Sequence, residues 1–455
     1  MDLVYLLPLL MFLALAMLLF SGFPVAWVLG GVGIGFGFIG MYYDVFEFIY
    51  FFNVISRIWG TAAENLILVA VPMFIFMGTM LERSGVANDL LHCLQVLLRR
   101  TPGGLALSVT IMGTIMAATT GIIGASVVMM TLLALPVMLD RGYDTPLATG
   151  TIAASGTLGI LIPPSIMLVI MADLLSISVG TLFLAAIGPG FLLAALYLIY
   201  IYTRTKFNPS LAPPLPDSIG PANRSELWVM IVRSFIPPIM LIVFVLGSIF
   251  AGWATPTEAA GVGALGALLL AVMNRKLNYA VLKDVLTRSA LTIGMIFGIF
   301  IGATCFSYVY RVLGGDDVVH NFIMTIGLGD WGLLFLMMGI VFLLGFFFDW
   351  IEITLIVLPL FAPIMKAMDF GTHIPYAIDI VPWIAILLAV NLQTSFLTPP
   401  FGFALFYMKG VAPPQVRMQQ IYRGIIPFVT LQLIGLSLVI WFPQLALWLP
   451  RAMLD

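Results

Sequence analysis

The chain has 455 residues, of which 62% are hydrophobic and only 9% are charged, whereas soluble domains carry roughly 25% charged residues. This composition excludes a soluble globular protein and makes lipid the expected solvent of most of the chain. The net charge of −2 and the lack of a basic run argue against a nucleic-acid partner. Cys93 and Cys305 have neither CxxC spacing nor a nearby His pair, so we expect both to be packing residues.

Long stretches without Asp, Glu, Lys, Arg or His recur along the sequence. About 20 apolar residues are enough to cross a bilayer, so we expect each stretch to form one span or a pair. The stretches are 3–43, 103–139, 234–257, 289–310, 380–408 and 424–450. The first has no preceding Lys or Arg and no small-residue cleavage site, so we interpret it as a span and not as a signal peptide.

The basic residues orient these spans, because Lys and Arg stay on the cytoplasmic side. One threading has crossings or hairpins at 3–20, 23–41, 66–82, 103–139, 145–172, 180–202, 229–250, 257–273, 289–310, 331–365, 380–408 and 424–449. It places 15 of the 19 basic residues inside and leaves outside only Arg57, Arg311, Lys366 and Arg451. The threading therefore predicts a multi-pass membrane protein with both termini in the periplasm.

Landmarks recur in the same order in the two halves of the chain, which indicates an internal repeat. They are a glycine turn (84–89 and 313–317), a hairpin whose return arm carries a proline (Pro136 and Pro359), and a polar break ending in a double proline (155–164 and 391–400). The threading opens the first hairpin to the inside and the second to the outside, so the repeats are inverted. Chance recurrence among 28 prolines and 43 glycines is the alternative. Against it, the order of the landmarks and the opposite sides that the charged residues assign to the two hairpins agree independently.

The predicted fold is an all-α polytopic membrane protein with inverted structural repeats, two re-entrant helical hairpins and two broken helices. Its predicted divisions are N-terminal scaffold spans (1–83), a first repeat (84–202, with hairpin 103–139 and broken helix 145–172), a cytoplasmic linker (203–228), further scaffold spans (229–310), a second repeat (311–423, with hairpin 331–365 and broken helix 380–408) and a C-terminal span (424–455).

The double prolines indicate where a site lies. Proline removes a hydrogen-bond donor and disfavours helix in the residue before it, so we expect unwound backbone over 155–164 and 391–400. Unwound backbone at membrane depth is tolerated only at a cavity or a binding site. A kink that serves packing alone is the alternative.

Polar residues at the hairpin tips and the breaks are the candidate ligands. Asp349 lies at the tip of the second hairpin, where a costly intramembrane charge indicates function, and it either binds a cation or becomes protonated when the cation leaves. Glu352, three residues on, shares this role or serves packing or a subunit interface. The predicted ion ligands are Gly124, Ser126, Ser155, Gly156, Asp349, Thr394 and Thr398, and sodium is the only metal expected. The predicted substrate contacts are Thr120, Ser126, Thr157, Asp349 and Ser395.

Two further considerations bear on these ligands. The first hairpin tip offers hydroxyls and glycines but no acid, which suits sodium better than a proton relay. For each hydroxyl, a hydrogen bond back to its own helix is the alternative role. Asp173 and Glu258 lie near span ends on the threading, where we expect a solvated or capping role.

Several strings resemble the DctM-like large membrane subunit of tripartite ATP-independent periplasmic (TRAP) transporters. They are 20–26, 124–127, 155–157 with 163–165, 255–260, 348–349, 358–359 and 397–402, and the match covers almost the whole chain. The resemblance implies an elevator-type ion transporter fold in the bacterial inner membrane. It also implies uptake of organic acids driven by Na⁺, with a small four-helix membrane subunit and a periplasmic substrate-binding protein as partners.

Two details refine this resemblance. The strings 349–354 and 391–395 resemble the branch of the family linked to α-keto acids and related monocarboxylates. The first hairpin tip departs from the Ser-Gly-Ser-Ser sequence that is common in the family, because Ile123 and Ala125 replace two hydroxyl residues. The first ion site is therefore expected to rely more on backbone carbonyls.

Other classes of membrane protein remain as alternatives. A stand-alone secondary carboxylate carrier of the same superfamily would share the inverted repeat. An intramembrane enzyme is disfavoured, because His92, His320 and His373 have no metal-binding spacing and no catalytic string occurs. A channel is disfavoured because paired broken helices suit occlusion better than open flow, which is an argument from fold analogy.

Overall fold

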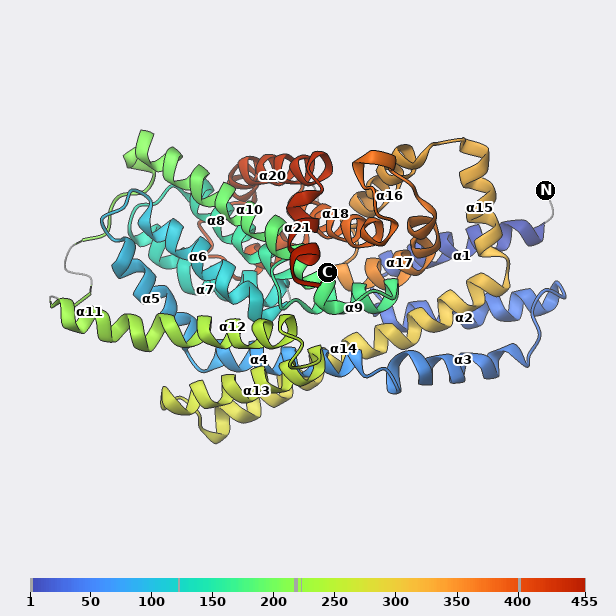
Figure 1. The fold of residues 1–455 in the computed structure, drawn as a ribbon, viewed down its shortest axis with the longest axis horizontal. Coiled ribbons are helices and arrows are strands. Elements are labelled where there is room, and N and C mark those ends of the chain that lie inside the picture. The colour runs from blue at the N-terminus through green and yellow to red at the C-terminus, as the bar shows by residue number, and fades with distance from the viewer. Residues whose placement is uncertain (1–2, 122, 217–219, 222, 400–401, 455) are drawn as a thin grey trace.

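The computed structural model describes residues 3–121, 123–216, 220–221, 223–399 and 402–454, and within these ranges the chain is helical without β-strands (Figure 1). Nine helices in the described part are long and apolar enough to cross a membrane, and a bent pair brings the number to ten. The all-helical, multi-pass architecture predicted from composition is thus confirmed.

The helices of the first half begin at the N-terminus with two apolar helices of 18 residues each. In order they are α1 (Leu3–Phe20), α2 (Val25–Tyr42), α3 (Tyr50–Ile58) with the π-helix η1 (Trp59–Ala63), η2 (Ile67–Val69), α4 (Ala70–Arg83), α5 (Val86–Leu98), α6 (Gly104–Thr120), α7 (Ile123–Asp140), α8 (Thr145–Thr157), η3 (Leu158–Ile160), α9 (Ile166–Leu175), α10 (Val179–Phe207) and η4 (Pro209–Leu211). The predicted linker 203–228 is helical at both ends, because α10 continues to Phe207 and α11 begins at Arg224.

The second half repeats this order. Its elements are α11 (Arg224–Met230), the π-helix η5 (Ile231–Phe235), α12 (Ile236–Phe250), α13 (Pro256–Met273), α14 (Tyr279–Val312), α15 (Gly315–Ile326), α16 (Asp330–Leu344), α17 (Trp350–Ala367), η6 (Gly371–His373), α18 (Ala377–Leu397), α19 (Phe403–Val411), α20 (Met418–Trp441) and α21 (Gln444–Leu454). The predicted C-terminal crossing at 424–449 is wrong in its extent, because α20 ends before Pro443, which cannot continue a helix, and α21 follows.

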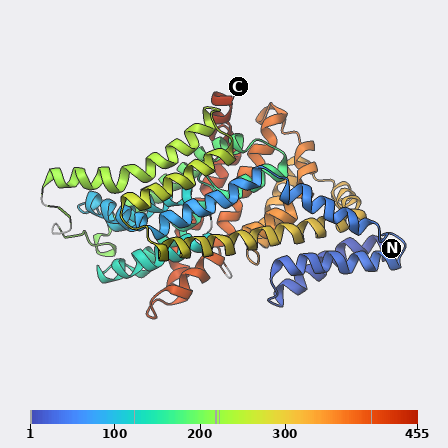
Figure 2. The ribbon, with the colours of Figure 1, turned by 90° about the horizontal axis from the view of Figure 1, so that it is seen from below.

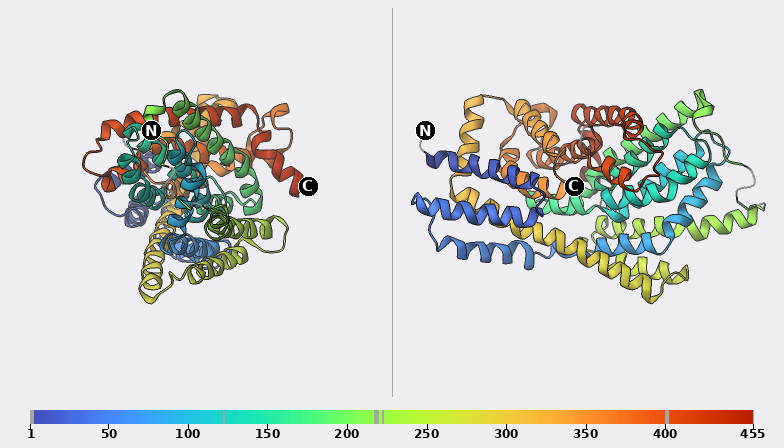
Figure 3. Two further views of the ribbon diagram at one scale, coloured as in Figure 1. Left: turned by 90° about the vertical axis from the view of Figure 1, so that its left-hand side faces the viewer. Right: turned by 180° about the vertical axis from the view of Figure 1, so that it is seen from behind.

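The contacts between the halves are reciprocal. Helix α7 of the first hairpin packs against α19, and α17 of the second hairpin packs against α9, which is the equivalent helix of the other half. In the same way, α2 packs against α14 while α13 packs against α4. Likewise, α20 packs against α8 while α10 packs against α18. Figure 3 shows α1 to α3 at one end of the molecule and α11 to α13 at the other. This exchange of partners is what two repeats related by a twofold axis produce, so the predicted internal repeat is confirmed.

The flanking long helix differs between the halves. Helix α14 is continuous over 34 residues, about 51 Å, which exceeds the roughly 30 Å hydrocarbon core of a bilayer. Its counterpart, from Tyr50 to Arg83, bends by 56° between Ala63 and Ile67. Figure 2 shows α3 and α4 beside α14. The threading began this crossing at 66, whereas the structure has a helical segment already over 50–63, which packs along α14.

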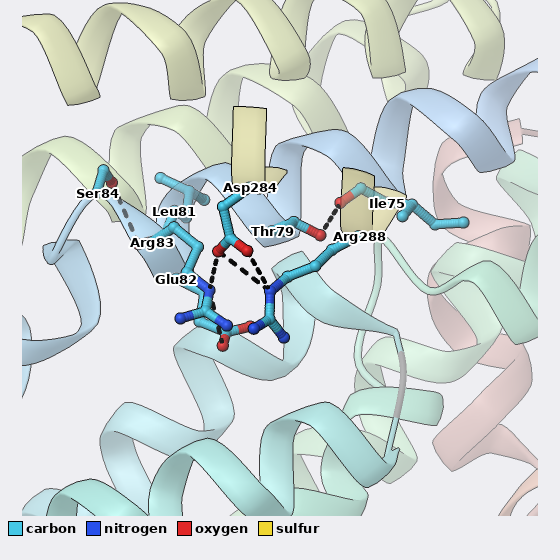
Figure 4. A network of polar contacts seen from close by, with 8 residues as sticks. All are labelled: Ile75, Thr79, Leu81, Glu82, Arg83, Ser84, Asp284 and Arg288. Atoms are coloured by element: carbon cyan, nitrogen blue, oxygen red, sulfur yellow. Dashed lines mark hydrogen bonds and ion pairs between the residues drawn. The ribbon is translucent and has the colours of Figure 1, made fainter. Parts of the chain in front are cut away.

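A polar cluster joins the ends of these two long segments (Figure 4). Asp284 of α14 lies 3.2 Å from the Arg83 Nε of α4 and also pairs with Arg288 one turn further on, at 2.9 Å. Directly after the cluster, Gly85 adopts a φ of 75°, which favours glycine, and the chain turns into α5. The cluster thus anchors the start of the segment that leads into the first hairpin.

Candidate functional site

The two hairpins end in short non-helical tips. Helix α6 stops at Gly121, whose φ of 57° suits glycine, and α7 starts at Ile123. In the second hairpin, residues 345–349 separate α16 from α17, and Asp349 is the N-cap of α17, since its Oδ1 accepts a hydrogen bond from the Trp350 amide at 2.8 Å. Both tips fall within the predicted hairpins 103–139 and 331–365.

The broken helices are interrupted over shorter segments than predicted. Helix α8 and η3 continue to Ile160, so Ser155, Gly156 and Thr157 are helical, and the described non-helical segment is 161–165. Helix α18 likewise continues to Leu397, which leaves Thr394 and Ser395 helical. The expected unwinding of 155–160 and 391–397 is therefore wrong. The effect of proline reaches only the residue before it and the carbonyl four residues back, so the preceding turns keep their helical bonds.

Each hairpin tip touches a broken helix. A methyl group on Gly345 would overlap the Ser395 hydroxyl, so the second tip lies directly against the end of α18. A Cβ on Gly121 would lie 3.0 Å from the Ile166 side chain at the start of α9. A Cβ on Gly124 would lie 3.0 Å from the ring of Tyr407 in α19. Glycines at these positions let the two hairpins close on the two interrupted helices from both halves of the chain.

A buried hydrogen-bond chain links the two broken helices. The Gln393 amide of α18 donates to Thr157 Oγ1 of α8 at 3.4 Å, and Thr157 donates to its own Ala154 carbonyl at 2.9 Å. Ser155 donates to Thr110 Oγ1 of α6 at 3.2 Å. Gln393 and Thr110 were not predicted as site residues. Gln393 stands inside the polar string 391–395, which is the signal that could have identified it, whereas nothing in the sequence marks Thr110.

Most other predicted hydroxyl ligands bond to their own helix. Thr394 donates to the Val390 carbonyl at 2.9 Å, Ser395 to Leu392 at 2.8 Å and Thr398 to Thr394 at 2.7 Å. This is the alternative role raised for hydroxyl residues in membrane helices. These bonds satisfy the hydroxyl donors and leave their oxygen lone pairs able to accept or to coordinate a cation.

The remaining predicted ligands lie around the first hairpin. Ser126 is buried, at 3% exposure, on α7. Gly156 faces α7 closely, since a Cβ there would lie 2.5 Å from Val127 Cγ2, so packing alone already requires glycine at this position. The backbone of Thr120 ends α6, and its side chain lies outside the described part of the structure.

The acids of the second hairpin are close together and buried to different degrees. Glu352 is only 8% exposed, and its Oε2 has no hydrogen-bond partner among the described residues. Asp349 and Glu352 lie within electrostatic range of each other and of Tyr407. No hydrogen bond joins Asp349 to Thr394, Ser395 or Thr398 in the described part of the chain, and the second tip meets this break at Gly345 and Ser395.

Two further acids have capping or bridging roles. Glu258 and Thr255 form a reciprocal capping box at the start of α13, which confirms the expected capping role of Glu258. Asp173 accepts a hydrogen bond from Asn65 at 2.8 Å and thereby bridges α9 to the bend between η1 and η2. No group of three or more His, Cys, Asp and Glu side chains suited to a metal ion occurs among the described residues.

Reciprocal broken helices enclosed by hairpin tips define the class of this protein as a membrane transporter. The family profile described as "Tripartite ATP-independent periplasmic transporter, DctM component" matches residues 12–445, so the chain belongs to the family of TRAP transporter large permeases. It is therefore a component of a transport system in the inner membrane and not an enzyme.

Individual relatives agree with this assignment. The C4-dicarboxylate TRAP transporter large permease protein DctM of Pseudomonas aeruginosa is 30% identical over 86% of this chain and 87% of its own length. The ectoine/5-hydroxyectoine TRAP transporter large permease protein UehC of Ruegeria pomeroyi is 30% identical over 96% of this chain and 97% of its own. Among solved structures, the YdaH transporter of Alcanivorax borkumensis is similar with a TM-score of 0.60 and 14% identity, over 88% of both chains, which concerns the fold alone.

Proposed function

We propose that this chain is the membrane translocation subunit of a sodium-driven importer of organic acids, in which the hairpins and broken helices move as one body past the flanking helices in an elevator motion. The observation that carries the proposal is the reciprocal closure of each hairpin tip on a broken helix, at Gly345 with Ser395 and at Gly121 with Ile166. A site enclosed from both halves can open to one side at a time.

The chemistry of the breaks supports sodium and a carboxylate as ligands. The chain is interrupted before α9 and α19, and interrupted helices in membrane transporters present backbone carbonyls that suit a hard cation. The N-termini of α9 and α19 carry the positive end of the helix dipole, which suits an anion. Asp349 supplies a carboxylate beside this site to balance the charge of a cation.

The proposed substrate is a carboxylate, with α-keto acids, related monocarboxylates and dicarboxylates as the classes to examine first. The names of the relatives support this range, since they include C4-dicarboxylate and ectoine permeases. The proposed partners are a small four-helix membrane subunit and a periplasmic substrate-binding protein, as expected of the TRAP family.

The decisive experiment is uptake into proteoliposomes that contain this chain and its small partner. With an inward sodium gradient, we expect uptake of the substrate only when the binding protein is added outside. Removing either the binding protein or the sodium gradient should reduce uptake to the level of empty liposomes. Robust uptake without the binding protein would identify the chain as a conventional stand-alone carrier, and uptake without sodium would refute sodium coupling.

The proposed orientation places both termini in the periplasm. We therefore expect single cysteines within 99–101 or 204–216 to be protected from an impermeant thiol reagent in intact cells, and single cysteines within 369–379 to be labelled. Permeabilised cells provide the control, because there every site should react. Labelling of both regions from the same side would contradict the orientation of the repeats.

A further inference from the structure

A cavity of about 350 Å³ lies between the flanking helices and the candidate site, and no step of the proposed transport cycle uses it so far. Its size is typical of small-molecule sites, which have roughly 300–1,000 Å³. Helices α3 and α14 form one wall, and α9 and α17 form the other. Leu355 on the α17 wall is six residues beyond Asp349, about 9 Å along the helix. We call this space the outer cavity.

The charged lining residues of the outer cavity are Arg57, Arg311 and Asp173. The two arginines outnumber the one lining aspartate, but Arg311 also pairs with Asp316 at 3.8 Å, so Arg57 carries the positive charge that is available to a ligand. The hydroxyls of Thr61, Thr304, Ser307 and Tyr308 also line it. Both arginines are among the few basic residues that the threading places outside, so they are unusual for their position. The Thr61 and Thr304 hydroxyls donate to the Arg57 and Phe300 carbonyls, so the charge of Arg57 and the hydroxyls of Ser307 and Tyr308 are the features that suit a small organic anion.

Arg57 is held in place without a carboxylate partner. Its guanidinium lies over the ring of Tyr308, 4.8 Å from the ring centroid. Tyr308 is itself buried, at 8% exposure, and its hydroxyl accepts a hydrogen bond from Asn53 at 3.0 Å. In the described part of the chain no Asp or Glu oxygen lies within ion-pair distance of Arg57. Stacking on an aromatic face leaves the N–H groups at the guanidinium edge able to bind an anion.

Arg311 pairs with Asp316 at 3.8 Å and ties the same wall to the second hairpin. Its guanidinium donates to the Pro359 carbonyl at 3.2 Å. This carbonyl has no helical donor, because the residue four positions later is Pro363, which lacks an N–H. Arg311 lies three residues after Tyr308 on α14, and residues at this spacing share one helix face. The wall that carries Arg57 and Tyr308 therefore directly adjoins α17.

Asp173 does not neutralise this wall completely. One of its carboxylate oxygens accepts a hydrogen bond from Asn65 at 2.8 Å, and no ion pair connects Asp173 with either arginine in the described structure.

From these observations we propose that the outer cavity binds the carboxylate group of an organic acid outside the candidate site, with Arg57 as its principal ligand. This proposal rests on the proposed function only for the chemical class of the substrate. The cavity then acts as a waiting site that concentrates the acid beside the second hairpin. Positive charge in a cleft with low-dielectric walls raises the local concentration of an anion.

The test measures the reactivity of a cysteine placed in the cavity by Ser307→Cys, in membranes that contain the complete transporter. The native Cys93 and Cys305 are buried and provide the background rate in the parent chain. We expect a negatively charged sulfonatoethyl thiosulfonate to react faster than its trimethylammonium analogue. Succinate, used as the probe anion, should slow the reaction at least about threefold relative to sodium chloride of equal ionic strength.

Arg57→Gln should abolish protection by succinate and slow the anionic reagent about threefold or more, which is the effect of removing one charge at about 6 Å in a water-like dielectric. Arg57→Lys should keep both effects in part. The matched control is Lys366→Gln, which removes an exposed positive charge at the end of α17 that does not line the cavity. It should change neither rate.

Equal protection by chloride, or protection that survives Arg57→Gln, would overturn the proposal. The labelling needs neither a sodium gradient nor the binding protein, so its outcome is separate from that of the uptake experiment. Protection by succinate without sodium-driven uptake would support the outer cavity and refute the proposed function. Sodium-driven uptake without protection would support the proposed function and refute the outer cavity as an anion site.

Discussion

Asp349→Asn is expected to reduce sodium-dependent uptake roughly 100-fold or more while expression and assembly persist. Asp349 caps α17 through a 2.8 Å hydrogen bond from the Trp350 amide, and asparagine is an equally good N-cap, so the hairpin should keep its shape. The variant removes the charge alone. Loss of one partner from a buried charged pair costs about 3–5 kcal/mol, which corresponds to at least a hundredfold change in affinity for a bound cation.

The matched control is Glu352→Gln in the same hairpin. Glu352 is more deeply buried, and its Oε2 has no partner among the described residues, so a neutral amide of similar shape relieves an uncompensated group. We expect a milder loss of uptake and an unchanged or raised melting temperature. Full transport by Asp349→Asn with unchanged sodium dependence would make Asp349 structural, and the ion sites would then consist of hydroxyls and carbonyls alone.

The parts of the fold that could be predicted depend on signals carried by short segments. Uncharged stretches specify helices in lipid, and the recurring order of glycine turns, hairpin prolines and double prolines specifies the repeat. Helix α3 could not be predicted in this way, because Asn53 and Arg57 interrupt its apolar pattern. Its polar residues find partners on α14, such as Tyr308 for both Asn53 and Arg57, and only the folded structure reveals them.

The candidate site, like the fold, could be predicted from the sequence only in part. The sequence indicated which segments would be polar and interrupted, and the hairpin tips and breaks lie where these signals placed them. It could not indicate that Gly124 packs against Tyr407 or that Gln393 reaches Thr157, because both contacts join halves that are more than 200 residues apart. The sequence analysis also predicted unwound segments that are too long, because a polar string before a proline has the same sequence pattern whether its backbone is helical or unwound.

The close contact between Gly345 and Ser395 leads to a second prediction with a large effect. Gly345 has a φ of −64°, which any residue adopts, so a substitution there acts through contact alone. The methyl group of Gly345→Ala would overlap the Ser395 hydroxyl and lie 2.7 Å from its Cβ. Overpacking of this kind costs about 1–3 kcal/mol. We expect at least a tenfold loss of uptake, because the second tip could no longer close on α18, together with a lower melting temperature.

Two further variants distinguish this contact from a general effect of alanine. Gly339→Ala on the same helix introduces a methyl group with no neighbour within 4 Å, so it should leave uptake and melting temperature nearly unchanged. Ser395→Gly removes the obstructing side chain, and in combination with Gly345→Ala it should restore the melting temperature even if uptake stays low through the loss of a predicted substrate contact. If Gly345→Ala transported normally, the close contact between the second tip and Ser395 would not be needed for transport. Closure of the site would then have to depend on the first hairpin, where Gly121 contacts Ile166.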